Sequence, residues 1–381
     1  DALPIFDFSS VNLYTFVKNP FTQDAHFDFE EFSSCVEDAQ RLVDDLIELE
    51  IEKVTNIIAK IKSDAEPLKL KQYEIELWEG ILDNYQRARR TGLGITAEGD
   101  MLAALGIKYG TSEASDFVER VHKAFALAAY RSSVQLAKER GSFPLYDEEK
   151  EKNNPFLNRL KDADSSLAEE MHKYGRRNVG LLTIAPNGSV SIETQTTSGI
   201  EPVFMPVYKR RRKVNPNDKD VHVDFKDETT GECFEEYIAF HPKFKTWMQV
   251  NGIDTTKRYT QKEIDALVAQ SPYAGATANE IDWKEKVCMQ GRIQKWIDHS
   301  ISVTINLPNS ASVETVDELY RTAYEVGCKG LTVYRDGCRA GVLLSASDKK
   351  KDEKIDKVIE ERPKTLDADV IRFKNNKENW I

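Results

Sequence analysis

The chain has 381 residues, of which 40% are hydrophobic and 31% are charged, so it can bury a large core. Its formal net charge of −11 and pI near 5.3 argue against nonspecific binding to nucleic acid, which requires a surplus of lysine and arginine. No apolar run reaches the roughly 18 residues of a membrane span, and the first residues lack the basic and apolar regions of a secretion signal. We therefore expect a cytoplasmic protein with no nucleic-acid and no membrane partner.

The cysteines are odd in number and scattered, with no CxxC pair and no metal-ligand spacing, which predicts neither a disulfide framework nor a metal site. Cys35 and Cys288 lie in helical patterns, where a free cysteine is most often a small core residue. Cys338 lies beside Arg335 and Arg339, so it is the candidate for a thiol with a lowered pKa. The first residue is Asp1, so we expect either processing or a start inside a longer polypeptide.

The first third of the chain predicts a strand followed by long helices. Residues 8–17 alternate as in a strand, and residues 28–63 repeat apolar side chains every three or four positions, with or without an interruption near Glu50. Residues 73–90 predict a second helix. Within the first helix an acidic group resembles a metal-binding cluster, but it contains no histidine at helical spacing, so we interpret it as a solvated face. This group consists of Asp44, Asp45, Glu48 and Glu50.

Strands and helices then alternate. Residues 89–95, RRTGLGI, predict a strand whose glycines allow close approach of another backbone, and the GxG pair is too short for a dinucleotide site. A helix is expected at 96–105, and another from a cap at Thr111 or Ser112 to Gly141. This alternation predicts an α/β fold with parallel strands and helical crossovers.

A buried strand at residues 179–185 runs directly into a polar loop. The loop offers one flexible glycine, two hydroxyls and a series of backbone N–H groups, which are the groups that hold a phosphate without a side-chain cation. A tight turn that ends the strand is the alternative interpretation. The candidate substrate-binding residues are Pro186, Asn187, Gly188, Ser189, Val190 and Ser191.

The last third predicts further elements of both kinds. The basic run at 209–213 is interpreted as a surface loop rather than a phosphate contact or a nuclear address, and residues 220–280 as a surface insertion with helices at 235–251 and 261–270. Helices are expected at 281–297 and 312–327, and strands at 299–307 and 331–334. His299 is either an acid or base or, more commonly for a lone histidine, a structural hydrogen-bonding partner. Residues 346–368 are expected to form a charged linker, which exchanges its amide hydrogens quickly.

Two long motifs occur in the order of a known family. Residues 178–202, NVGLLTIAPNGSVSIETQTTSGIEP, resemble the diphosphate-binding signature of the ribonucleotide reductase catalytic subunit, and residues 329–337, KGLTVYRDG, resemble its last barrel strand. The closest likeness is to the adenosylcobalamin-dependent, class II branch. The resemblance implies that residues 1–345 form the second half of a ten-stranded α/β barrel with helical and loop insertions, and that residues 369–381 begin a truncated C-terminal region.

The same resemblance implies a function. A class II reductase converts ribonucleoside di- or triphosphates to deoxyribonucleotides by a radical mechanism, with adenosylcobalamin as cofactor, and the loop at 186–191 would grip the substrate diphosphate. The implied partners are a ribonucleotide, a thioredoxin-type reductant and the missing N-terminal half, in cis or as a separate chain. A second copy of the chain, in a homodimer, is a further candidate partner.

The sequence departs from the family where the radical chemistry resides. Phe6 occupies the position of a redox-active cysteine, and no Asn-x-Cys-x-Glu radical motif is present, so no radical or reducing cysteine can be assigned. We therefore expect the isolated chain to be inactive. One alternative is a class I large subunit with Tyr334 as catalytic candidate in a tyrosine relay, which the preceding Val333 disfavours. The other is a fragment that binds nucleotide phosphate and is inactive without a complementary chain.

Overall fold

The structure is a computed structural model that describes residues 7–215, 222–226 and 231–336, and the backbone of two short strands near the C-terminus. Two compact units divide the chain, Asp1–Ala346 and Ser347–Ile381. In the second unit, β10 (Phe373–Asn375) pairs antiparallel with β11 (Glu378–Trp380). Cys338 and the linker expected at 346–368 lie outside the described residues.

A row of five parallel segments forms the centre of the first unit. Strand β1 (Asp7–Asn12) pairs with β4 (Thr91–Thr96), and β8 (Thr304–Leu307) pairs with β9 (Thr332–Arg335), both in parallel. Single parallel bridges, Leu93 with Leu182 and Ile184 with Ile301, join the two pairs through the segment between them. The predicted parallel arrangement is therefore confirmed, whereas the strand expected at 179–185 consists of these two bridges alone. The described strands do not close into a barrel.

The glycine-spaced strand passes close to a neighbouring backbone, as its sequence predicts. A Cβ on Gly94 would lie 2.6 Å from the carbonyl oxygen of Thr183, a distance that side chains essentially never adopt. Leu93 N donates to the carbonyl of Leu181, and Thr183 N donates to the carbonyl of Leu93, so the two segments are hydrogen-bonded where the glycine lies. Glycine at this position allows β4 to join the segment that leads to the candidate site.

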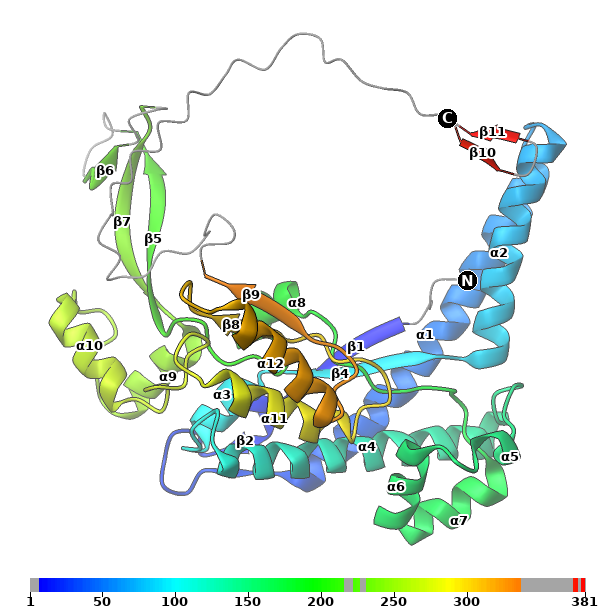
Figure 1. Cartoon of the computed structure of the whole chain (residues 1–381), viewed down its shortest axis with the longest axis horizontal. Helices are drawn as coiled ribbons and strands as arrows, with labels where there is room; N and C mark the ends of the chain where they lie inside the picture. Colours follow the sequence, from blue (N-terminus) through cyan, green and yellow to red (C-terminus); the bar gives the residue numbers. More distant parts are fainter. Residues whose placement is uncertain (1–6, 216–221, 227–230, 337–372, 376–377, 381) are drawn as a thin grey trace. The chain divides into compact units, whose positions relative to one another are not determined.

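Two long helices follow the first strand (Figure 1). Helix α1 (Phe29–Ser63) begins at the cap Asp28, whose side chain accepts a hydrogen bond from Glu31 N, and it continues without interruption past Glu50. Helix α2 (Leu68–Ala88) returns along it and ends at Arg89, which has left-handed φ/ψ. The two helices pack through the apolar side chains that the three-four periodicity identifies, namely Ile47, Val54, Ile58 and Tyr85.

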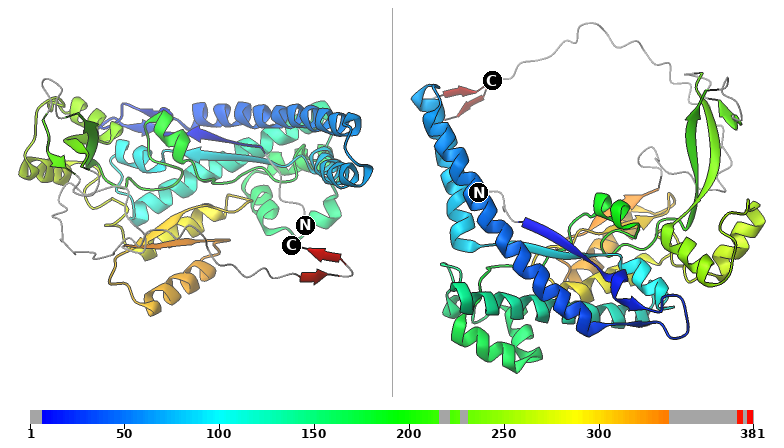
Figure 2. Two further views of the ribbon diagram at one scale, coloured as in Figure 1. Left: turned by 90° about the horizontal axis from the view of Figure 1, so that it is seen from above. Right: turned by 180° about the vertical axis from the view of Figure 1, so that it is seen from behind.

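Helix α4 lies beside α1 and completes the layer that covers β1 and β4 (Figure 2). It spans Ser112–Arg140, with Thr111 as its cap and Gly141 after its last turn, as predicted. The short helix α3 (Glu98–Ala104) follows β4 directly and is buried along its whole length. The largest apolar core lies between these helices and the strands, and includes Phe32, Leu93, Phe125 and Ile184.

Shorter elements connect these parts. Residues 13–16 form a 3-10 turn, so the strand expected at 8–17 divides into β1 and β2 (Val17–Lys18), and β2 pairs with β3 (His26–Phe27). The charged stretch that precedes residues 179–185 contains three short helices, α5 (Glu148–Glu151), α6 (Pro155–Ala163) and α7 (Ser165–Tyr174). Helices α11 (Trp283–Gln294) and α12 (Val313–Glu325) lie where periodicity predicts them, and Ser312 caps α12.

The region of the expected insertion differs from its prediction in two places. The basic run lies in strand β5 (Val207–Val214), not in a loop, because it pairs with the acidic strand β7 (Cys233–Phe240). Arg211 and Arg212 form ion pairs with Glu236 and Glu235 across these strands. The helix expected at 235–251 begins only at Pro242, since its first part belongs to β7. The remaining elements of the region are β6 (Phe225–Lys226), α9 (Pro242–Val250) and α10 (Gln261–Gln270).

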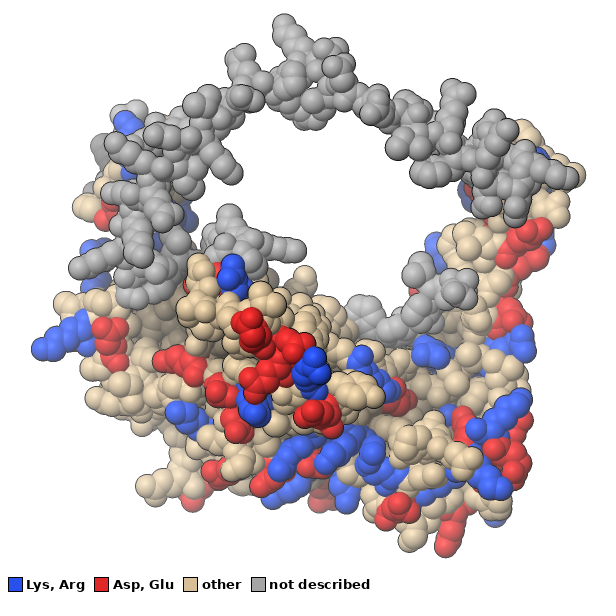
Figure 3. All heavy atoms as spheres, in the orientation of Figure 1, with Lys and Arg blue, Asp and Glu red and all other residues tan. Residues whose placement is uncertain are grey.

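The surface contains charges of both signs. On the face seen in Figure 3, lysine and arginine side chains lie among aspartate and glutamate side chains rather than apart from them. In the part of the chain that the structure describes, no helix combines the length and apolar character needed to cross a membrane.

Candidate functional site

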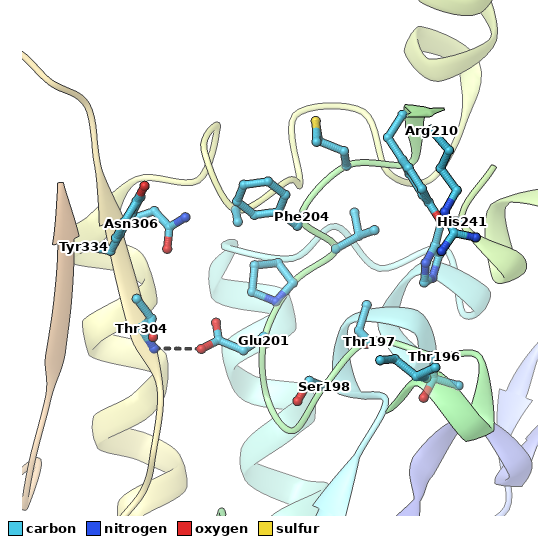
Figure 4. A pocket seen from close by; sticks show the side chains of 16 residues that line it. Thr196, Thr197, Ser198, Glu201, Phe204, Arg210, His241, Thr304, Asn306 and Tyr334 are labelled. Carbon is cyan, nitrogen blue, oxygen red and sulfur yellow. Dashed lines mark hydrogen bonds between the residues drawn. The ribbon is translucent and has the colours of Figure 1, made fainter. Parts of the chain in front are cut away.

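A pocket of about 650 Å³ opens where the central segments reach their carboxyl ends. Three parts of the chain form it: the stretch after Ile184, the strands β8 and β9, and the junction of β5 with residues before α9 (Figure 4). Ligands of open α/β sheets collect at the carboxyl ends of parallel strands. The lining residues are Ile192, Thr196, Thr197, Ser198, Glu201, Pro202, Val203, Phe204, Met205, Tyr208, Arg210, His241, Ala278, Thr304, Asn306 and Tyr334.

The six residues of the predicted phosphate loop lie next to this lining and not within it. Four of them belong to helix α8 (Gly188–Thr194), so the expected loop is mainly the first turn of a helix. The buried Asn187 precedes the helix, and its side chain makes no capping hydrogen bond; its Nδ2 donates to the carbonyl of Ile95 at 2.9 Å. The N–H groups of a first helical turn have no acceptor within the helix, so those of α8 remain available to an anion.

Tyr334, the predicted catalytic candidate, does line the pocket. Figure 4 shows it with Asn306 at one side, and Arg210 with His241 at the other. The pocket therefore has a cationic side and a side with a phenol and an amide. The sequence analysis assigned Arg210 to a surface loop and did not single out His241 or Asn306.

Glu201 fixes the pocket floor to β8. Its Oε1 accepts a hydrogen bond from Thr304 N at 2.7 Å, and its Oε2 accepts one from Lys286 Nζ at 2.6 Å. Lys286 is buried and also donates to the carbonyl of Thr304 at 2.6 Å. Burial lowers the pKa of the Lys286 ammonium, and the adjacent Glu201 opposes that shift. This pair holds the segment after α8 against the strand that carries Asn306.

The buried carboxylate of Asp100 holds the His241 side chain, which lies beside Arg210 in the pocket. The carboxylate is fully buried in α3 and accepts hydrogen bonds from His241 Nε2 at 2.8 Å, Tyr273 OH at 2.8 Å and Thr197 N at 2.7 Å. It also contributes to the environment of Tyr14, whose pKa is raised to about 12 by burial and by the charge of Asp100. A single buried carboxylate thus positions both an imidazole and the threonine backbone that line the pocket.

The thiols of the described residues lie elsewhere. Cys35 is exposed rather than part of the core, Cys233 is buried, and Cys288 and Cys328 are half-buried. Burial raises the pKa of Cys328 to about 11, with a smaller contribution from Cys288, so this thiol is not an activated nucleophile. None of these cysteines lines the pocket. Over the described ranges, no group of three or more histidine, cysteine, aspartate or glutamate side chains could hold a metal ion.

His299 is also distant from the pocket lining. It lies just before the parallel bridge of Ile301, at the amino ends of the strands, and lines a separate cavity with Arg90 and Lys329. His299 therefore cannot act as an acid or base in the pocket of about 650 Å³.

The chain resembles known proteins over most of its length. The family described as "Ribonucleotide reductase, barrel domain" matches residues 7–334. The Mycobacterium tuberculosis (strain CDC 1551 / Oshkosh) protein named vitamin B12-dependent ribonucleoside-diphosphate reductase is 30% identical over 265 residues, which are 68% of this chain and 33% of that protein. The protein of the same name from Thermoplasma acidophilum is 28% identical over 363 residues, covering 92% of this chain and 39% of the relative.

A solved structure supports the fold. The Actinobacillus ureae class Id ribonucleotide reductase alpha subunit superposes with a TM-score of 0.54 at 18% identity, over 87% of this chain and 49% of that chain. The chain thus spans between a third and two fifths of the length of the two curated relatives named above. Because the family match covers residues 7–334, the chain belongs to the ribonucleotide reductase barrel-domain family.

Proposed function

We propose that this chain is the substrate-binding part of a ribonucleotide reductase catalytic subunit of the vitamin B12-dependent class. The whole enzyme would reduce ribonucleoside di- or triphosphates to deoxyribonucleotides in the cytoplasm. The observation that carries the proposal is the pocket itself, which lies at the carboxyl ends of the parallel segments and is lined in part by Thr196, Thr197, Ser198, Glu201 and Pro202 of the signature segment 178–202. Its volume of about 650 Å³ suits a nucleotide-sized ligand.

The chemistry of the lining suggests how a nucleotide would lie. The diphosphate would meet the first-turn N–H groups of Gly188, Ser189 and Val190, with Arg210 supplying positive charge from β5. The ribose would then extend toward Asn306 and Tyr334, whose amide and phenol can hydrogen-bond its hydroxyls.

The remaining lining residues would position the substrate and exclude water. Phe204 and Met205 are apolar, and closing such side chains over a radical reaction would protect it from side reactions with solvent. Glu201 and Lys286 would keep the signature segment in register with β8, because each makes its hydrogen bonds to the other or to Thr304. These are positioning roles, and we assign no proton transfer to them.

The cofactor enters this proposal through the names of the relatives, which are B12-dependent enzymes. When bound, adenosylcobalamin would supply the radical. The residues described here do not form its site, because a cavity of about 650 Å³ accommodates a nucleotide but not a nucleotide together with a corrin. We therefore assign no cobalamin-binding residue and derive no step through the cofactor.

The missing groups imply a complementary polypeptide. The five parallel segments would be one half of a ten-stranded barrel, and the other half, in cis or as a separate chain, would supply the radical cysteine that this sequence lacks. A thioredoxin-type reductant would restore the enzyme after turnover, and a homodimer is a further assembly to test. By itself the chain would form no product from CDP or CTP with adenosylcobalamin and dithiothreitol.

Two narrower functions compete with this one. In a class I large subunit, a tyrosine relay would reach the pocket, and Tyr334 is the lining residue in the matching strand. A fragment that only binds nucleotide phosphate would use the same pocket without chemistry. Product formation by the native assembly with adenosylcobalamin, and without a second protein radical source, would separate the B12-dependent enzyme from both.

The binding mode is tested by Gly188→Val. A Cβ at this position would meet no other atom of the chain within 4 Å, so the substitution should leave the fold intact while it blocks the approach of a phosphate to α8. We expect the affinity for CDP, measured by calorimetry on the native assembly, to fall about tenfold or more, as expected when charge-assisted hydrogen bonds are lost.

The matched control is Gly80→Val, a helical glycine of α2 whose Cβ also would meet nothing within 4 Å. It should leave CDP affinity unchanged. An unchanged affinity in Gly188→Val as well would rule out the phosphate position at α8.

A further inference from the structure

A second polar cavity lies at the opposite ends of the strands and shares no lining residue with the nucleotide pocket. Its volume is about 200 Å³. Four of its lining residues shortly precede the parallel segments. Arg90 precedes β4, Gly180 precedes the β-bridge at Leu182, His299 precedes the β-bridge at Ile301, and Lys329 precedes β9. We refer to it as the amino-end cavity.

The acidic group of this cavity, Asp298, already has donors on both oxygens, and its Oδ1 also lies 3.8 Å from His299 Nε2. The Oδ2 atom of Asp298 accepts hydrogen bonds from Tyr130 OH at 2.7 Å and from Leu181 N at 2.8 Å, and its Oδ1 accepts one from Leu182 N at 2.7 Å. Asp298 therefore does not depend on a lysine or arginine to satisfy its oxygens.

One of the cations, Arg176, already uses four of its five N–H donors. The buried Arg176 donates through Nε to the carbonyl of Asn178 at 3.1 Å and through NH2 to the carbonyl of Val179 at 3.1 Å. Its NH1 and NH2 both donate to the carboxylate of Glu151, the latter at 2.6 Å. Arg176 and Glu151 thus neutralise each other and leave the charge of the cavity to the remaining groups.

Arg90 and Lys329 keep donors to spare. Among the described residues, Arg90 approaches one polar group, His299 Nδ1 at 3.5 Å, and it forms no ion pair with a carboxylate there, although a guanidinium has five N–H donors. Lys329, at the exposed rim, donates to the carbonyl of Asp298 with one of its three N–H groups. Two cations with surplus donors thus share a small cavity with an imidazole.

We propose that the amino-end cavity binds the phosphate group of a small anion, held by Arg90 and Lys329 with the His299 ring as a third contact. Its volume suits one phosphate group and excludes a nucleoside, which needs several hundred Å³. The shared chemistry is that of inorganic phosphate and of the terminal phosphate of a nucleotide. The proposal does not depend on the function assigned to the nucleotide pocket.

The His299 ring is the natural reporter of such binding. Burial lowers the pKa of His299, Arg90 and Lys329 lower it further, and Asp298 and a backbone hydrogen bond to Gly180 raise it. Gly180 allows the ring to pack this closely, since a Cβ there would lie 2.7 Å from His299 Nε2. A phosphate between Arg90 and Lys329 would offset the two cations, so the pKa of His299 should rise when the site fills.

The experiment titrates the full 381-residue chain with inorganic phosphate at constant ionic strength and follows the ring resonances of the six histidines by NMR. We expect saturable shifts at His299, and an increase in its pKa. Arg90→Gln and Lys329→Gln should each weaken phosphate binding about tenfold or more, and Arg90→Lys, which restores the charge, should recover part of it. Arg321→Gln, on α12 outside this cavity, is the control and should bind phosphate as the parent does.

A second titration with ATP distinguishes the sources of the phosphate. Saturable His299 shifts with ATP, lost in Arg90→Gln, support the proposal and assign a terminal phosphate, whereas shifts with inorganic phosphate alone support it and assign the free anion. Absence of saturable shifts at His299 with both ligands overturns the proposal. Equal phosphate affinity in the parent, Arg90→Gln and Lys329→Gln, each with an unchanged thermal melting profile, also overturns it.

Discussion

Buried charges around the nucleotide pocket each rely on a few partners, so single substitutions there should have large effects. Lys286 has two acceptors within 2.6 Å, the Oε2 atom of Glu201 and the carbonyl of Thr304. Asp100 has three donors, one of which is the His241 imidazole that lines the pocket. Lys286 and Asp100 differ from surface charges because they are themselves buried, so water cannot readily replace a partner that is removed from them.

Lys286→Gln should destabilise the fold. The shorter amide cannot reach both acceptors, so the Glu201 carboxylate and the Thr304 carbonyl lose a charged donor, and we expect the free energy of unfolding to fall by about 2–3 kcal/mol. Urea denaturation measures this change. The control is Lys284→Gln on the same helix, whose exposed pair with Glu318 at 3.4 Å should contribute less than about 1 kcal/mol. Equal losses in both variants would show that the buried pair has no special role.

His122 should make the protein sensitive to acid. Burial lowers its pKa to about 4, so the ring is neutral above that pH although His122 Nε2 and Glu98 Oε2 lie 3.6 Å apart. Burial and then the charge of Glu201 raise the pKa of Glu98. Below about pH 6.5 His122 binds a proton in the unfolded chain but not in the folded one, so the contribution of His122 to stability falls as the pH decreases toward about 4. The expected contribution is about 3 kcal/mol over this window.

The variant His122→Asn isolates this contribution. Its amide can still donate to the carbonyl of Val118, to which the Nδ1 atom lies at 2.8 Å, but it does not titrate. The difference in unfolding free energy between parent and variant should therefore shrink as the pH decreases from 6.5 to 4, whereas the exposed His26→Asn should not change the profile. Parallel profiles for the parent and His122→Asn would contradict the neutral, buried state of His122.

At the scale of elements, those whose pattern and caps lie in neighbouring residues were predictable from the sequence. Those stabilised by residues far away in the sequence were not. Helices α1 and α4 were predicted within one or two residues because apolar periodicity and the caps Asp28 and Thr111 are local features. Strand β5 was missed because its basic residues are stabilised by acidic residues more than 20 positions later in β7, and no local pattern contains that pairing. For the same reason Arg210 and His241 were not recognised as pocket residues. Of the predicted site residues, Tyr334 lines the pocket, whereas residues 186–191 lie beside it.

Asp44 is the clearest case of a misjudged face. The sequence analysis assigned it to a solvated surface, but it is fully buried and joins α1 to the residues that begin two central segments. Its Oδ1 lies 2.9 Å from Arg89 NH2 and accepts a hydrogen bond from Asn178 Nδ2 at 2.8 Å, and its Oδ2 lies 3.3 Å from Arg140 NH1. Helical periodicity does not distinguish a buried carboxylate from an exposed one, because the partners lie in other elements.

Asp44→Ala should remove the buried carboxylate partner of Arg89, which then keeps only the Glu48 carboxylate at 2.7 Å, and reduce the free energy of unfolding by about 3–5 kcal/mol. The neighbouring Asp45→Ala removes a half-exposed carboxylate that pairs with Arg140 at 2.6 Å, and it should cost about 1 kcal/mol or less. Chemical denaturation of both variants gives the comparison. A loss below about 1 kcal/mol in Asp44→Ala would mean that the arginines find other partners and that the cluster is not a structural link.

At the scale of the whole molecule, the row of five parallel segments places the two proposed binding sites at opposite ends of the strands. The nucleotide pocket lies at the carboxyl ends, and the amino-end cavity lies at the opposite ends. The α/β class and parallel pairing followed from alternating strands and helices, while the family motifs pointed to the side where we propose that substrate binds. The chain covers 33% to 39% of the two relatives from M. tuberculosis and T. acidophilum, so the radical chemistry is proposed to involve residues that this chain does not contain.

The most direct test of the central claim is an experimental structure of the native protein with CDP bound. We expect the diphosphate oxygens to lie within hydrogen-bonding distance of the N–H groups of Gly188, Ser189 and Val190, and the ribose to lie between these groups and the side formed by Asn306 and Tyr334. A nucleotide bound outside this pocket, or inside it with its diphosphate directed away from α8, would contradict the account.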